Sequence, residues 1–169
     1  SYSPAVARIR WIYKDSTGNE RDFSIETCPF ITATETIYKK IRNFKYRYMN
    51  PALLSLVPHE LDTYDPFIIR EALNNAIAHQ DYGCHGMINV VEEEDRLIFS
   101  NFGSFIPNSI RSVLENDAPE EHYRNKMLAN AMVELGLVDT IGSGIRRMFN
   151  KQRDSLFPMP DYDFSDNNR

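Results

Sequence analysis

The order of the hydrophobic periodicities along the chain limits its fold more than any other sequence feature. Polar and apolar residues alternate over residues 8–13 and again over 21–25, and the turn-forming residues 15–19 separate the two runs. This pattern predicts a β-hairpin. Two more short strands, 87–91 and 96–100, follow a long helical stretch. Strands, helices, strands and helices in this order predict an α+β sandwich rather than a strictly alternating βαβ fold.

Capping residues and apolar spacing predict where the helices begin. Thr32 and Glu35 have the spacing of a capping box, which opens a helix that runs to about Met49. Asp65 is expected to cap a second helix over residues 66–82, with Pro66 at its first position. The remaining expectations are a short helix after Pro107, a helix over 125–135, a last helix that opens at 142–144 and runs to about Arg153, and an extended segment over 156–164.

Composition restricts the class of protein but not its chemistry. The 169 residues carry a net charge of −5 and are 42% hydrophobic, which suits one globular domain. Cys28 and Cys84 are too few for a disulfide framework, so a reduced, cytoplasmic setting is expected, with no membrane segment. We expect a single domain over 1–169, with a hairpin and helix over 1–63 and a motif-bearing core over 64–164. The abrupt start suggests that it is cut from a longer multidomain protein.

One stripe of the helix over 66–82 carries the polar groups that suggest chemistry. Glu71, Asn75 and His79 recur every four residues and border the apolar face, where they could point into a pocket beside the core. A solvated polar helix flank has the same appearance, so the stripe alone does not establish a site.

Two glycine-containing turns add to this stripe. Asn101 ends a strand and Gly103 follows, which places an amide beside a backbone that a base can approach, although ordinary turns use the same residues. Gly142, Ser143 and Gly144 open a helix, whose free N–H groups are suited to phosphate, with arginine nearby. No Walker A motif occurs, which excludes a P-loop NTPase.

These motifs in this order resemble the GHKL (Bergerat-fold) ATPase superfamily. Residues 70–82 (REALNNAIAHQDY), the Arg124-Asn125 pair and residues 135–148 (LGLVDTIGSGIRRM) resemble its RecG-related branch of putative transcriptional regulators. The resemblance implies a mixed β-sheet with helices on one face, ATP and Mg²⁺ as cofactors, and a lid over 103–141.

The resemblance also implies roles for single residues. Glu71 would be the general base, and Asn75 the ligand of Mg²⁺. Asn101 would accept a hydrogen bond from the adenine amino group, with Gly103 giving the base room. The rest of the nucleotide-binding set is His79, Gly142, Ser143, Gly144 and Arg146.

The resemblance implies a Mg-dependent nucleotide switch with slow or no hydrolysis, not a helicase motor. Nucleic acid would be bound through flanking domains, and a second copy of the chain would be a further partner, in a homodimer. Gln80 replaces an arginine of the branch near the phosphates, and Phe102 and Phe105 either line or fill the adenine pocket. Two alternatives therefore stay open. One is a degenerate interaction module without nucleotide binding, and the other is a DNA-contacting fragment that uses the basic helix 34–49.

Overall fold

A computed structural model describes residues 7–49, 57–104, 110–115, 124–138 and 143–165. Its main sheet has the strand order β2-β1-β5-β6, formed by β1 (Arg8–Lys14), β2 (Glu20–Thr27), β5 (Ile88–Glu92) and β6 (Leu97–Ser100). The strand β1 runs parallel to β5, whereas the pairs β1–β2 and β5–β6 are antiparallel. The predicted hairpin and the two later strands are confirmed, and the sheet is mixed.

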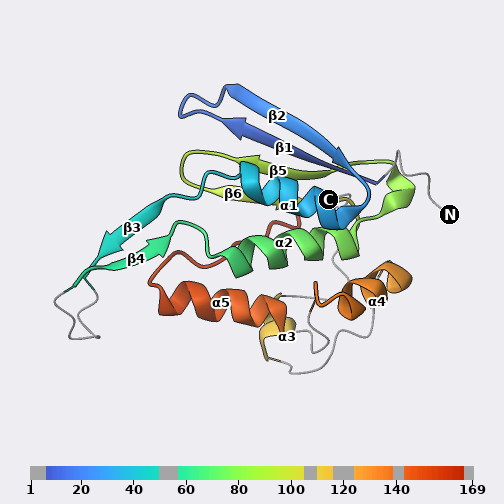
Figure 1. Cartoon of the computed structure of the whole chain (residues 1–169). Helices are drawn as coiled ribbons and strands as arrows, with labels where there is room; N and C mark the ends of the chain where they lie inside the picture. Colours follow the sequence, from blue (N-terminus) through green and yellow to red (C-terminus); the bar gives the residue numbers. More distant parts are fainter. Residues whose placement is uncertain (1–6, 50–56, 105–109, 116–123, 139–142, 166–169) are drawn as a thin grey trace.

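The helices lie on one side of this sheet (Figure 1). They are α1 (Phe30–Lys40), α2 (Pro66–His79), α3 (Ile110–Glu115), α4 (Lys126–Glu134) and α5 (Gly144–Asp154). Both α4 and α5 contact α2, and α2 contacts α1 and β6. This α+β arrangement confirms the predicted fold class. Among the described helices, none has the length and apolar character needed to cross a bilayer.

The core forms where α1 and α2 meet the sheet. Ile9, Trp11, Ile88 and Val90 point to the helices from the two central strands and are at most 3% exposed. The helices contribute side chains at helical spacing, namely Ala33, Ile37, Ile69, Leu73, Ala76 and Ile77. Because α2 is packed between the sheet and α5, its polar stripe has a fixed position.

The first predicted helix is wrong at both ends. It begins after Pro29 rather than at a capping box, and Thr32 Oγ1 donates to the Pro29 carbonyl from inside the first turn, at 2.9 Å. It ends at Lys40. The predicted last turn is instead the strand β3 (Lys45–Tyr48), which pairs with β4 (His59–Asp62) as a separate two-stranded sheet.

Two features explain this difference. The backbone N–H and Nε of Arg42 both donate to the buried Glu92 carboxylate, which turns the chain away from the helix axis. Residues 45–48 alternate cationic and aromatic side chains, which is strand periodicity. The proposed basic helix is thus split, and Lys45 and Arg47 pair with Glu60 of β4. This split removes the helix on which the DNA-contacting alternative rested.

The later helices begin as the sequence predicts, but α2 ends at His79 rather than at 82, with Gln80 as its C-cap and a separate 3₁₀ turn over Tyr82–Cys84. Asp65 caps α2 by accepting from the Phe67 N–H at 2.8 Å, and Gly136 ends α4 with a positive φ of 67°. The short helix α3 follows Pro107 as expected. Residues 157–165 contain neither helix nor strand.

Candidate functional site

The polar stripe of α2 is partly buried rather than solvated. Glu71 is only 4% exposed, whereas Asn75 and His79 are half-buried. The amide Nδ2 of Asn75 donates to Glu71 Oε1 at 3.4 Å. This bond leaves the Asn75 amide oxygen, within the described part of the chain, without a protein partner. A carboxylate and an amide oxygen are thus held side by side on one helix.

The first residue of α5 lies directly against Glu71. A Cβ added to Gly144 would overlap Glu71 Oε1, so only glycine fits at this position. The helix α5 is anchored at its other end as well, because Lys151 Nζ donates to Asp65 Oδ2 at 2.7 Å. The predicted glycine turn and the predicted glutamate, far apart in sequence, therefore meet in space.

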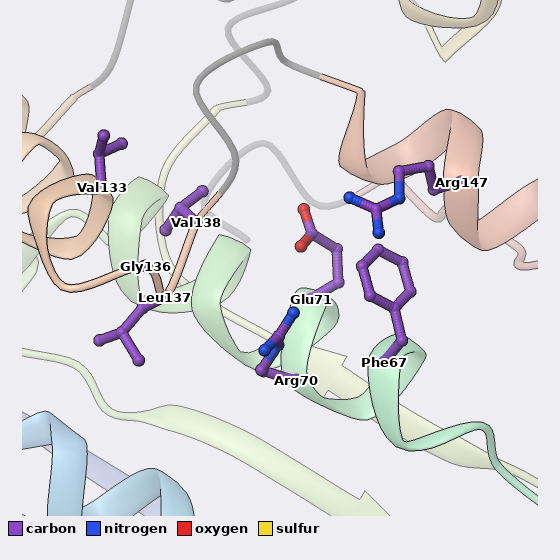
Figure 2. A pocket seen from close by; sticks show the side chains of 8 residues that line it. All are labelled: Phe67, Arg70, Glu71, Val133, Gly136, Leu137, Val138 and Arg147. Atoms are coloured by element: carbon purple, nitrogen blue, oxygen red, sulfur yellow. The ribbon is translucent and has the colours of Figure 1, made fainter.

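A cavity of about 320 Å³ opens beside this contact (Figure 2). Its charged groups are Glu71, Arg70 and Arg147, and the Arg147 guanidinium lies 4.4 Å from the centre of the Phe67 ring. The remaining lining is largely apolar and comes from Val133 of α4 and from three residues that follow this helix, Gly136, Leu137 and Val138. The cavity thus combines an apolar wall with two guanidinium groups and one carboxylate.

The two neighbouring arginines of α5 have different positions. Arg146, which belongs to the predicted set, donates from Nη2 to the Leu114 carbonyl of α3 at 3.0 Å. Arg147 lines the cavity instead. Ser143 immediately precedes α5, while Gly142 lies outside the described residues.

The strand-end motif forms a second cluster. Asn101 is half-buried, with its Nδ2 3.3 Å from the Phe102 carbonyl oxygen. Gly103 has a φ of 118°, and a Cβ there would lie 2.9 Å from Arg124 Nε. The room that glycine provides is thus next to the Arg124 guanidinium. The ring of Phe102 packs on Gly86, where a Cβ would overlap it; Phe105 lies outside the described residues.

The Gln80 side chain packs inside the protein, whereas the resemblance implies an arginine near the phosphates at this position. Its side chain is fully buried, because Oε1 accepts from the Phe102 N–H at 2.8 Å and Nε2 donates to the Gly86 carbonyl at 3.0 Å. The substitution at position 80 therefore concerns packing of the turn after β6.

Asn125 and Arg124 hold the same turn from the other side. Asn125 Nδ2 donates to the carbonyls of Ala78 and Gln80, at 3.0 and 2.7 Å, and so binds the C-terminal end of α2. Arg124 bonds Asp81 and the carbonyl of Ser104. Sequence reasoning noted this pair only as part of a resemblance, because its partners are distant in sequence.

Two further residues near Glu71 were missed. Asn74 is buried and donates to the Leu137 carbonyl at 2.5 Å, which joins α2 to the segment after α4. The Tyr162 ring stacks on Phe149 with centroids 6.3 Å apart. Burial raises the pKa of Tyr162 to about 12, and the negative charge of Glu71 adds to this rise. Tyr162 lies outside every motif, and Asn74 lies within residues 70–82 but at a position to which sequence reasoning assigned no role.

Comparison with known proteins finds a family match for the second half of the chain. A family model described as "Putative ATP-dependent DNA helicase recG C-terminal" matches residues 85–169. That segment includes Asn101, Gly103, Arg124, Asn125 and the start of α5, but not Glu71 or Asn75. No curated protein gives a significant match.

A solved structure supports the fold. The DIP2311 protein from Corynebacterium diphtheriae superposes with a TM-score of 0.75 at 22% sequence identity, over 94% of this chain and 32% of that chain. The chain thus spans about a third of the length of that protein. At this identity the likeness concerns architecture alone.

Proposed function

The chain belongs to the family described as putative ATP-dependent DNA helicase recG C-terminal, an ATPase-like family, and from this premise we propose that it binds ATP. The observation that carries the proposal is the contact between Glu71 of α2 and Gly144 of α5, beside the cavity of about 320 Å³. It brings a general-base candidate, a hard oxygen ligand and a helix N-terminus into one place.

Each of these groups has a definite task in the proposal. The N-terminus of α5 would hold phosphate oxygens with its free N–H groups. The Glu71 carboxylate would accept the proton of the attacking water. The Asn75 amide oxygen suits Mg²⁺, because its nitrogen is already bonded to Glu71. When bound, Mg²⁺ would offset the phosphate charge in a site whose protein cations are few.

The remaining assignments are part of the same proposal. Asn101 and Gly103 would take the adenine side, and His79, Gly142, Ser143 and Arg146 would complete the nucleotide-binding set. In this GHKL-type scheme residues 103–141 act as a lid that reports nucleotide binding to attached domains of a transcriptional regulator. Residues 1–169 would be one domain of such a protein, and hydrolysis would be slow or absent.

Titration calorimetry with a non-hydrolysable ATP analogue tests the proposal. We expect one site per chain, with affinity that falls when Mg²⁺ is removed and falls again in Asn75→Ala. Lys126→Ala, an exposed change at the start of α4, is the matched control and should bind as wild type. Absence of heat from protein shown to be folded by circular dichroism would favour the interaction module without nucleotide binding.

A further inference from the structure

The face of the sheet that points away from the helices carries an apolar row. The register pairs Phe23 with Ile12, Ile12 with Val91, and Val91 with Ile98, so the row crosses all four strands. Alternate residues of these strands point into the core, and the row therefore points outward. In Figure 1 no described helix covers this face.

The side-chain alternation of the edge strand β2 is not that of a strand whose outer face is exposed to solvent. Phe23 and Ile25 lie on it and are 59% and 44% exposed, while Asp22, Ser24 and Glu26 point to the helix side. A strand that met solvent on its outer face would have the opposite alternation. Together with Ile98, which is 37% exposed, these side chains form an apolar patch that calls for a partner.

A row of alternating charges lies next to the apolar row. Its order across the sheet is Glu20, Lys14, Glu93 and Arg96. Lys14 lies opposite Glu20 where the register of β1 and β2 shifts, and Arg21, which the shift skips, is paired with Asp15. Lys14 Nζ is 3.5 Å from Glu93 Oε1, and Arg96 Nε is 2.6 Å from Glu93 Oε2. The signs therefore read minus, plus, minus, plus.

The direction of the strands makes this face self-complementary. The central strands β1 and β5 are parallel, and the outer strands β2 and β6 both run against them. A two-fold axis along the strands, between β1 and β5, would set β1 over the β5 of a second copy. Reversing the charge row then opposes each charge with its opposite, for instance Lys14 with the partner's Glu93. In the apolar row, Ile12 meets the partner's Val91, and Phe23 meets the partner's Ile98.

We propose that this face is an isologous interface with a second copy of the same chain, formed by the row Phe23, Ile12, Val91 and Ile98 and by the adjacent charge row. Twisted sheets that pack face to face align within roughly 30°, which keeps the central pairs in contact. A two-fold dimer is the commonest closed assembly. The interface does not depend on nucleotide binding, because it lies on the side of the sheet opposite the candidate site.

Charge reversal with mixing tests the interface. Lys14→Glu alone would set a carboxylate against the partner's Glu93, and Glu93→Lys alone would set an ammonium group against the partner's Lys14. Each variant should dissociate at least about tenfold more readily than wild type in sedimentation equilibrium. An equimolar mixture of the two variants should recover the dimer, since both intermolecular pairs then join groups of opposite charge. Each variant also loses the Lys14–Glu93 ion pair within its own chain. Mixing cannot restore that pair, so recovery of the dimer reports on the intermolecular pairs alone.

Apolar variants give a second, independent measurement. Phe23→Asp should weaken the dimer by at least about tenfold, whereas Met127→Asp, at an exposed position on α4, should not. Circular dichroism checks that both variants are folded. The proposal is overturned by a wild-type chain that stays monomeric at millimolar concentration, by a dimer insensitive to Phe23→Asp, or by charge variants that do not associate on mixing. If Phe23 is shielded from solvent only in a longer form of the protein, a neighbouring domain covers this face. That result would also overturn the proposal.

Discussion

At the scale of single residues, the contact between Gly144 and Glu71 strictly limits which residue can occupy position 144. The carboxylate occupies the space where any other residue would carry its Cβ. Both residues are buried, so neither can move into solvent to relieve an overlap. Glutamate at position 71 therefore requires glycine at position 144, and we expect the two positions to covary among related sequences.

Gly144→Ala should therefore lower the free energy of unfolding by about 1–3 kcal/mol, the usual cost of overpacking. It should also abolish binding of the ATP analogue, because α5 has to move away from Glu71. Urea denaturation and calorimetry measure the two effects. Gly18→Ala is the control, since its surroundings are open and its cost of about 1 kcal/mol comes from a φ of 81° alone. Wild-type binding by Gly144→Ala would contradict the assigned site.

Glu71→Gln separates binding from hydrolysis. The amide has the shape of the carboxylate and leaves no cavity, but it cannot accept a proton from water. Any slow ATP hydrolysis should fall by about 100-fold or more while affinity for the analogue stays near that of wild type. Phosphate release in single-turnover reactions measures the rate. Unchanged turnover would remove Glu71 from the chemistry.

At the scale of elements, the end of α2 is fastened by a residue that follows it by 45 positions. Asn125 donates to Gln80 across that separation, and Gln80 in turn bonds the Phe102 N–H. The strand-end turn, the helix end and the start of α4 therefore form one hydrogen-bonded unit. A displacement of Asn125 would therefore be transmitted through Gln80 to Phe102, which lies between Asn101 and Gly103.

Asn125→Ala should destabilise the fold by about 1–3 kcal/mol, because two buried carbonyls lose their donor. Amide exchange of Asp81 and Phe102, which are hydrogen-bonded to this turn, should accelerate, while exchange in β1 should not. Lys126→Ala is the neighbouring control. Equal protection of Asp81 in both variants would show that Asn125 does not hold the turn.

The elements also show what sequence reasoning can reach. The helices α2 and α4 were predictable because capping, apolar spacing and terminating glycines are local properties of each segment. The strand β3 was not, because Phe44 and Tyr48 fit both a helical and an alternating pattern, and its partner β4 begins beyond residue 57. Glu71 could be predicted from its motif. The contacts of Gln80 and Asn125 could not, because they depend on tertiary packing between segments that are distant in sequence.

At the scale of the whole molecule, one buried and two half-buried tyrosines set the stability at high pH. Burial raises the pKa of Tyr64 and of Tyr162 to about 12, and burial also raises the pKa of Tyr82. In the unfolded chain these phenols lose their protons near pH 10. The folded protein then binds more protons than the unfolded one, so its stability decreases as pH rises between these values.

Chemical denaturation at several pH values tests this expectation. Stability from these groups should be fully present below pH about 10 and should be lost as pH rises toward 12. Tyr162→Phe should make the decline less steep. Absorbance at the tyrosinate band follows the ionisation itself. A decline of equal slope in Tyr162→Phe would show that this phenol ionises normally in the folded state.

The parallel pair of β1 and β5 has a consequence for synthesis on the ribosome. Arg10 and Asn89 are bonded across 79 residues, so the inner edge of the first hairpin has no strand to pair with until the fifth strand has been made. From the end of β2 at Thr27 to the start of β5 at Ile88, at 5–20 residues per second, this interval is roughly 3–12 s. Throughout that time the nascent chain exposes the β1 edge with Trp11 and Ile9 uncovered. Translation speed between residues 27 and 88, and the chaperones that meet the chain there, should therefore govern how much of it escapes aggregation.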